Sequence, residues 1–208
     1  MKSVFSFCLF SVFVPVQGAV FITGVLDGTL SGATPRAFEL YTTTAIADFE
    51  DTYQFQYASN TSSYGNVTTS FGTIPPNSFF YITNSTTELE NAFGAGLVAS
   101  QNGGITPTGN DSGRIQLKAD SSIVDEAYTN ASDVSVYTDS FMYRVNGTGP
   151  DSSYNPSNWI FGGNDLLDGK TASEIGGLVP FGTFQPIPEP STILLGGLAL
   201  LGFIRRRR

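Results

Sequence analysis

Carboxylates are the main candidates for acid–base chemistry in this chain. Its 208 residues contain no histidine and one cysteine, Cys8, which excludes Ser-His-Asp and Cys-His catalysis and His-ligated zinc. Two adjacent acidic pairs occur, Glu50-Asp51 and Asp125-Glu126. Neighbours in a strand point to opposite faces, whereas glycoside hydrolysis needs two carboxylates that face each other. The pattern therefore predicts solvated strand residues at Glu50, Asp51 and Glu126, and a protein that is not an enzyme.

Three aspartates in two turn-rich segments are weak candidates for calcium ligands. Asp165 and Asp168 lie in residues 164–169, and Asp111 lies in residues 109–112. Calcium prefers hard oxygen ligands of this kind, but neither segment has the ligand spacing of an EF-hand loop. We expect these side chains to cap turns, and we expect no cofactor.

Arg144 is an unusual residue because it follows three apolar or aromatic residues in a predicted strand. We expect its guanidinium to stack on Trp159 or Tyr143, or to pair with Asp125. The lone Trp159 is expected to anchor the core and not to form a platform for sugars.

The N-terminal segment has the pattern of a secretory signal peptide. A single charge at Lys2 precedes the apolar run 4–16, and small or β-branched residues stand before Ala19. The run is too short to span a bilayer as a helix, so we predict that signal peptidase removes residues 1–18. Cys8 would leave with them, so the mature chain would hold no disulfide.

The C-terminal segment has three parts with different physical properties. Pro188-Glu189-Pro190 predicts an extended spacer. The apolar run 191–204 is about 21 Å long as a helix, so it spans a bilayer only if the membrane thins. The positive-inside rule places the four arginines after it in the cytoplasm and the main body across the inner membrane; these are Arg205, Arg206, Arg207 and Arg208.

This arrangement resembles the PEP-CTERM protein-sorting signal of biofilm-forming, exopolysaccharide-producing Gram-negative bacteria. The resemblance covers about the last 20 residues. It implies that an exosortase, a membrane enzyme, cleaves near Pro188-Glu189-Pro190 and passes the protein to the cell surface or beyond. The chain would then be the substrate of that enzyme.

The body between the two signals is acidic and rich in strand-forming residues. It contains five basic and 17 acidic residues, a net charge of about −12, which argues against nucleic acid as a partner. Turn residues separate β-branched and aromatic runs, and their spacing predicts an antiparallel β-sandwich. The predicted strands are residues 20–25, 37–42, 52–57, 79–83, 114–118, 123–128 and 141–145.

One helix is expected at the edge of the sandwich. Ser85 and Glu88 form a capping-box pattern, and apolar residues follow at helical spacing until Gly94. We expect the sandwich to occupy residues 19–168. Residues 169–187 are glycine-rich, and they are expected to form a loose stalk or a last edge strand before the sorting signal at 188–208.

The body also resembles the lamin-tail domain of bacterial secreted proteins, an immunoglobulin-like β-sandwich without catalytic residues. This resemblance implies an accessory or interaction module and places Asp125 where it would bond turn amides. The segments that carry it are residues 37–41, 72–82, 109–111, 115–117, 123–125, 141–144, 147–150 and 154–159.

Together these features predict a non-enzymatic, secreted or envelope-associated protein of the exopolysaccharide or biofilm matrix. Two alternatives stay open. A carbohydrate-binding or adhesin-like module that binds extracellular polysaccharide would show a strip of exposed aromatic side chains on one sheet face. A carboxylate-dependent hydrolase would show two or more carboxylates that converge in a pocket.

Overall fold

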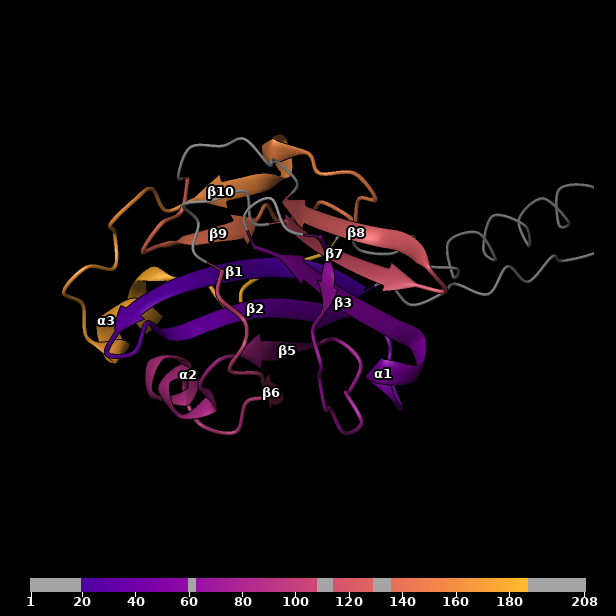
Figure 1. The fold of residues 1–208 in the computed structure, drawn as a ribbon, viewed down its shortest axis with the longest axis horizontal. Helices are drawn as coiled ribbons and strands as arrows, with labels where there is room; N and C mark the ends of the chain where they lie inside the picture. The colour runs from indigo at the N-terminus through magenta and orange to yellow at the C-terminus, as the bar shows by residue number, and fades with distance from the viewer. Residues whose placement is uncertain (1–19, 60–62, 108–113, 129–135, 187–208) are drawn as a thin grey trace, which may run out of the picture.

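The computed structural model describes residues 20–59, 63–107, 114–128 and 136–186. The predicted signal peptide, Asp111 and the sorting signal 188–208 lie outside these residues. Within the described part, two β-sheets pack face to face, and two helices with the C-terminal segment cover the outer face of the larger sheet (Figure 1). The result is a β-sandwich with a third layer.

The larger sheet has six strands in the order β10-β9-β1-β2-β5-β6. Its two long central strands, β1 and β2, are buried almost throughout, because both faces of this sheet are covered. The strand bounds are β1 Val20–Leu30, β2 Thr34–Thr42, β5 Ser78–Thr83, β6 Ala99–Gln101, β9 Phe141–Arg144 and β10 Trp159–Phe161.

The smaller sheet has four strands in the order β4-β3-β7-β8. A one-turn helix, α1 (Phe49–Thr52), leads directly into this sheet, and the short 3-10 helix η1 (Pro156–Asn158) leads into β10. The strand bounds are β3 Tyr53–Ala58, β4 Gly65–Asn66, β7 Arg114–Ala119 and β8 Ser122–Tyr128.

All seven predicted strands are confirmed, and three short strands, β4, β6 and β10, were not expected. The prediction of a purely antiparallel sandwich is wrong at one pair. Strands β5 and β6 run parallel, because helix α2 (Thr86–Phe93) crosses over between them and returns the chain in the same direction. Strands of only two or three residues are too short to produce a readable alternation of apolar and polar side chains.

Helix α2 confirms the expected helix. The hydroxyl of Ser85 accepts a hydrogen bond from the backbone N–H of Glu88 at 3.2 Å and so caps the first turn. Gly94 ends the helix with a φ of 101°, a backbone conformation that glycine adopts without strain.

The segment expected as a stalk or an edge strand is neither. Residues 172–178 form helix α3 (Ala172–Leu178), which begins with a reciprocal capping box between Thr171 and Glu174. The chain then runs back along the large sheet and buries Phe181 and Phe184. We call residues 171–185 the C-terminal strap. The body therefore extends well beyond the predicted boundary at residue 168.

Helix α3 packs closely on α2 because one of its glycines has no side chain. A Cβ atom on Gly176 would lie 1.9 Å from the carbonyl oxygen of Ala92 in α2. The neighbouring Gly177 has open space around it. Gly176 thus sets the distance between the two helices, whereas Gly177 makes no such contact.

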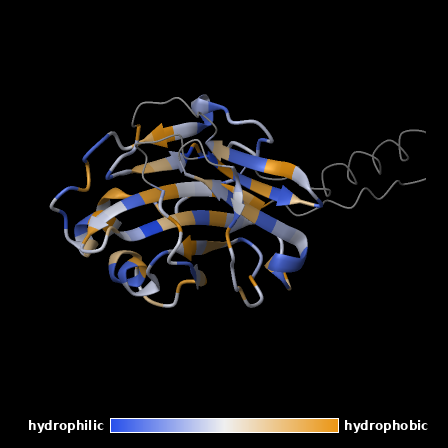
Figure 2. Cartoon of the chain, in the orientation of Figure 1, coloured by the Kyte–Doolittle hydropathy of each residue, from blue (hydrophilic) through white to orange (hydrophobic). Residues whose placement is uncertain are grey.

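The core has two parts, one on each face of the large sheet. Phe38, Leu40 and Phe80 belong to the cluster between the sheets, whereas Tyr41 and Tyr81 belong to the cluster under the helices and strap. In Figure 2 the colour of the ribbon changes between hydrophobic and hydrophilic residues along the strands. Because successive strand residues point to opposite faces, the same strands supply both parts of the core.

Among the described residues, no helix combines the length and apolar character needed to cross a membrane. The apolar run 191–204 lies outside those residues, so the C-terminal membrane helix stays a prediction.

Candidate functional site

The sorting signal leaves the body at a point where the chain is held by backbone hydrogen bonds. The N–H of Gln185 donates to the side-chain oxygen of Asn146 at 2.9 Å, and the N–H of Gly147 donates to the carbonyl oxygen of Gln185 at 2.8 Å. The ring of the preceding Phe184 lies 5.5 Å from that of Phe21 at the start of β1. The chain is therefore anchored to within three residues of Pro188.

A buried carboxyl group holds the strap from the side of the large sheet. Glu39 lies on β2 and is fully buried. One of its oxygens accepts a hydrogen bond from the hydroxyl of Thr23 at 2.7 Å, and the other accepts from the backbone N–H of Gly182 at 2.5 Å. The hydroxyls of Tyr81 and Tyr143 are also hydrogen-bonded to it. Burial raises the pKa of Glu39 to about 7, and these donors oppose the rise.

Aromatic contacts reinforce this attachment. The ring of Phe181 stacks on Phe93 of α2 at 5.1 Å and lies 5.9 Å from the ring of Tyr81. The hydroxyl of Tyr143 accepts a hydrogen bond from the N–H of Thr183 at 3.1 Å, and burial raises the pKa of this tyrosine. The strap is thus an integral part of the packed body.

The sequence analysis did not identify Glu39 as a structural centre. Its side chain shares a strand face with Tyr41, and in a two-layer sandwich that face would be in water. The one available signal is a charged residue at the centre of the apolar run 37–41. For the strap, the Thr171-x-x-Glu174 pattern is a capping box that could have revealed α3.

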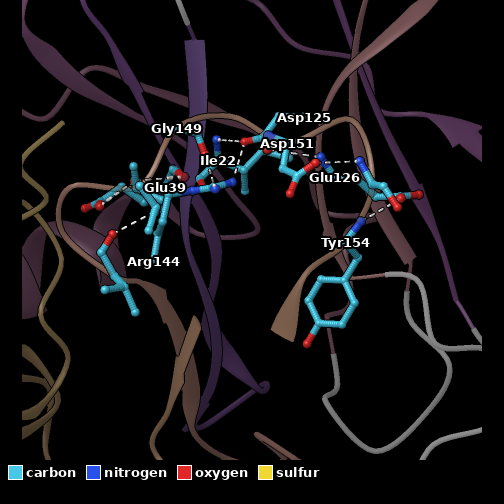
Figure 3. Close-up of polar contacts among 12 residues, drawn as sticks. Ile22, Glu39, Asp125, Glu126, Arg144, Gly149, Asp151 and Tyr154 are labelled. Carbon is cyan, nitrogen blue, oxygen red and sulfur yellow. Dashed lines mark hydrogen bonds and ion pairs between the residues drawn. The ribbon is translucent and has the colours of Figure 1, made fainter. Parts of the chain in front are cut away.

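Arg144 and Asp125 form a buried ion pair between the two sheets, as expected (Figure 3). A guanidinium nitrogen of Arg144, which is 1% exposed, lies 2.6 Å from an oxygen of Asp125. The other guanidinium nitrogens donate to the carbonyl oxygens of Ile22 and Gly149. The guanidinium also stacks over the ring of Trp159 at 4.6 Å. Trp159 is itself buried in the core, which confirms its predicted role.

Asp125 bonds backbone amides, as the resemblance implied. It accepts hydrogen bonds from the N–H groups of Ile22 and Asp151 at 2.8 Å each, and from that of Glu126 at 3.1 Å. Burial raises the pKa of Asp125, and the charge of Arg144 and the amides of Asp151 and Ile22 oppose that rise. The carboxylate joins β8 of the small sheet to β1 of the large one.

The other carboxylates considered for acid–base chemistry are exposed or half-buried. Glu50 and Asp51 are exposed, as expected, but they belong to α1 and not to a strand. Glu126 is half-buried and not fully solvated, because its carboxylate accepts a hydrogen bond from the N–H of Tyr154 at 3.1 Å (Figure 3). Asp125 and Glu126 therefore bond different groups instead of facing one another.

An open pocket of about 370 Å³ lies beside α1. Two exposed carboxylates, Asp48 and Asp51, are among its lining residues. Asp48 is the N-cap of α1 and accepts a hydrogen bond from the N–H of Asp51 at 3.3 Å. Capping a helix is a sufficient structural role for this aspartate.

Asp165 and Asp168 come together with a third aspartate that the sequence analysis missed. Carboxylate oxygens of Asp139, Asp165 and Asp168 lie within 4.8 Å of one another. Burial and the two neighbouring negative charges raise the pKa of Asp139. Within the described part of the chain, these three residues form the cluster that could hold a cation. Asp111 lies outside the described residues. The expectation that Asp165 and Asp168 cap turns instead of binding calcium stays a prediction.

The aromatic side chains of the described residues are buried or half-buried. The large apolar side chains that are exposed in this part of the chain are aliphatic, namely Ile123, Ile160 and Leu178. No strip of exposed aromatic rings therefore occurs on the described surface, and nothing there favours a carbohydrate-binding face.

Comparison with known proteins identifies one end of the chain. Residues 186–208 match the PEP-CTERM protein-sorting motif. No curated protein matches the chain, and no solved structure matches it either. The motif implies export, membrane anchoring and subsequent exosortase cleavage. The chain therefore carries the sorting signal of an exosortase-processed protein of the cell surface.

Proposed function

We propose that this protein is a non-enzymatic structural or interaction component of the extracellular polysaccharide or biofilm matrix. The single observation that carries the proposal is the sorting motif at residues 186–208, directly after a β-rich body anchored at Gln185. Signal peptidase would remove residues 1–18, the apolar run 191–204 would hold the precursor in the inner membrane, and exosortase would then release the body.

The body is proposed to be a lamin-tail-like, immunoglobulin-like sandwich that acts through its surface. Its most buried carboxylates, Glu39 and Asp125, are occupied by hydrogen bonds to the body itself. Groups engaged in this way stabilise a fold and are not free to act on a substrate. This supports an interaction role over a hydrolytic one.

The test is intact-mass spectrometry of the protein from cells that contain the exosortase, with its compartment recorded. We expect a mass that lacks residues 1–18 and everything beyond about Pro188, found at the surface or in the medium. A Pro188→Ala, Pro190→Ala double variant is expected to keep the tail and remain in the inner membrane.

The matched control is the Pro75→Ala, Pro76→Ala double variant, which removes two prolines from an exposed part of the body. It should be processed as the parent protein is. Surface delivery of the Pro188→Ala, Pro190→Ala variant at the parental level would contradict the proposed sorting. A mature mass that retains residues 191–208 in the parent would do the same.

A further inference from the structure

Both ends of the described body lie at one end of the large sheet. Strand β1 starts at Val20, and the strap finishes at Gln185, whose predecessor Phe184 packs against Phe21. The hydrogen bonds from Gln185 to the turn at Asn146 and Gly147 fix this point of exit. We call these residues, Val20 and Phe21 with the Asn146–Gly147 turn and Phe184–Gln185, the exit end.

The chain between the exit end and the apolar segments is short. Six residue steps separate Gln185 from Ser191, where the C-terminal apolar run begins, so the two are at most about 21 Å apart. Four steps separate Val16 from Val20, which allows at most about 14 Å. Any membrane segment at either end would hold the exit end close to the lipid.

The strap cannot supply extra length without a large loss of packing. Phe181 and Phe184 are buried, and Gly182 is bonded to the fully buried Glu39. Releasing the strap would leave the carboxyl of Glu39 without its bond to Gly182 and would expose the rings of Phe181 and Phe184 to water. Each change would lower the stability of the body substantially. The length of chain that connects the folded body to the apolar run is therefore counted from Gln185 and not from Lys170.

The opposite end of the sheet carries negative charge. Strand β1 has 11 residues, so the hairpin turn that follows Leu30 lies about 35 Å from Val20. The carboxylate of Asp27 near that turn accepts a hydrogen bond from the N–H of Asp139, a member of the three-aspartate cluster. The exit-end residues Asn146, Gly147, Thr148 and Gln185 are themselves uncharged. The exposed carboxylates of Asp48, Glu50 and Asp51 follow Thr42, the pairing partner of Val20, so both ends of the sheet carry negative charge.

We infer that the membrane-anchored precursor stands on the lipid headgroup surface by its exit end, with the Asp139 cluster directed away from the membrane. The inference rests on the proposed function, because it takes residues 191–204 as the anchor. The connection of at most about 21 Å between Gln185 and the apolar run, against about 35 Å between the two ends of β1, favours this orientation over the reverse. The folded body would thus meet the sorting enzyme with its motif no more than a few residues from the protein surface.

The experiment places one fluorescent probe at each end of the full-length precursor. In a Cys8→Ala background, Thr148→Cys labels the exit end and Ser31→Cys labels the opposite hairpin turn. Each labelled precursor, made without exosortase, is reconstituted into phosphatidylcholine–phosphatidylglycerol vesicles that contain a headgroup-attached nitroxide quencher. Circular dichroism checks that both variants keep the parental fold.

We expect strong quenching of the fluorescence of the probe at position 148. The probe at position 31 should keep the fluorescence intensity that it has in vesicles without quencher. A flexible Gly-Ser insert of about 20 residues after Pro186, which spans roughly 25 Å on average, should reduce the quenching at position 148. Equal quenching at the two positions, or stronger quenching at position 31, overturns the orientation alone. Failure of the precursor to float with the vesicles overturns the anchor as well, and with it the proposed function.

Discussion

Two fully buried carboxylates in this protein are stabilised in different ways. Asp125 lies between the sheets, opposite the guanidinium of Arg144, and also accepts three backbone N–H groups. Glu39 lies between the large sheet and the strap, and its hydrogen-bond donors are neutral hydroxyls and one backbone amide. Both groups join parts of the chain that are more than 100 residues apart.

The difference shows how a missing counter-charge makes a buried acid sensitive to pH. Burial disfavours the charged form of both groups. At Asp125 the positive charge of Arg144 opposes that effect. At Glu39 no cation is among the groups that oppose it, and the pKa rises to about 7. The contact between the sheets should therefore depend on an ion pair, and the attachment of the strap on the protonation of one carboxyl.

The largest loss of stability should come from removing the cation that pairs with Asp125. Arg144→Met leaves Asp125 buried without its counter-charge, which should lower the free energy of unfolding by about 3 to 5 kcal/mol. Urea unfolding of the body (residues 19–186) measures this. Arg36→Met is the control, because the partly exposed Arg36 lies 2.8 Å from Asp27, and we expect a smaller loss.

Adding Asp125→Asn to Arg144→Met sharpens the same test. The double variant should lose less stability than the sum of the two single variants, because the unpaired charge is gone. Simple additivity of the two losses would show that the ion pair does not couple these residues.

The second effect concerns Glu39 and pH. Its pKa is raised from 4.5 to about 7, so its contribution to stability is fully present below pH 4.5 and is lost as the pH rises to about 7. The shift corresponds to a loss of about 3 kcal/mol. Glu39→Gln should remove this part of the pH dependence, measured by urea unfolding between pH 4 and 8.

Burial also raises the pKa values of Asp27 and Asp125, so the informative quantity is the difference between parent and variant at each pH. The same substitution at the exposed Glu50 is the matched control for the change of side chain. If the Glu39→Gln and parent curves run parallel across this range, Glu39 is not the group that titrates.

A third, smaller loss of stability tests how the strap packs on α2, independently of the charge of Glu39. Gly176→Ala places a methyl group against the carbonyl oxygen of Ala92 and should destabilise the body by about 1 to 3 kcal/mol. Gly177→Ala, one residue later in the same helix, meets no atom within 4 Å and should be neutral or slightly stabilising. Thermal unfolding compares the two, and equal effects would mean that α3 does not pack on α2 as described.

The smallest effect is expected in the cluster of Asp139, Asp165 and Asp168, two of which are exposed. Asp168→Asn should lower the pKa of Asp139, because it removes one of the negative charges that raise it. An NMR titration of the Asp139 carboxyl measures the shift, and the change in stability should stay below about 0.5 kcal/mol because solvent screens these groups. An unchanged titration curve would contradict this electrostatic coupling. The same spectra with added calcium chloride test whether Asp165 and Asp168 bind the ion.

Much of the fold was predictable from local patterns. The seven predicted strands are alternating, β-branched or aromatic runs bounded by turn residues, which is the pattern that identifies strands, and Ser85 marks the start of α2. The pairing of Asp125 with Arg144 was also predictable, because a lone arginine in an apolar strand needs a counter-charge and few basic residues are available in the body.

The strap was predictable only at its first turn, where Thr171 and Glu174 form a capping-box pattern. Gly176 and Gly177 lower the helix propensity of residues 172–178, so the segment reads as a loop. Its helix depends on packing against α2, where Gly176 permits close approach. The role of Glu39 follows from the same contact, because the strap, together with α2, buries the face on which this side chain lies.

The sequence by itself determined the sorting signal of this protein and seven strands of its body. A sorting motif is a linear pattern of proline, apolar and basic residues, so it can be recognised without knowledge of the fold. The residue patterns that identify strands are local as well. Tertiary structure decided that the large sheet is covered on both faces, that Glu39 is buried beneath the strap, and that Val20 and Gln185 emerge at one end. Each of these depends on contacts between residues distant in the chain, such as the 143 positions between Glu39 and Gly182, and a local pattern does not encode such contacts.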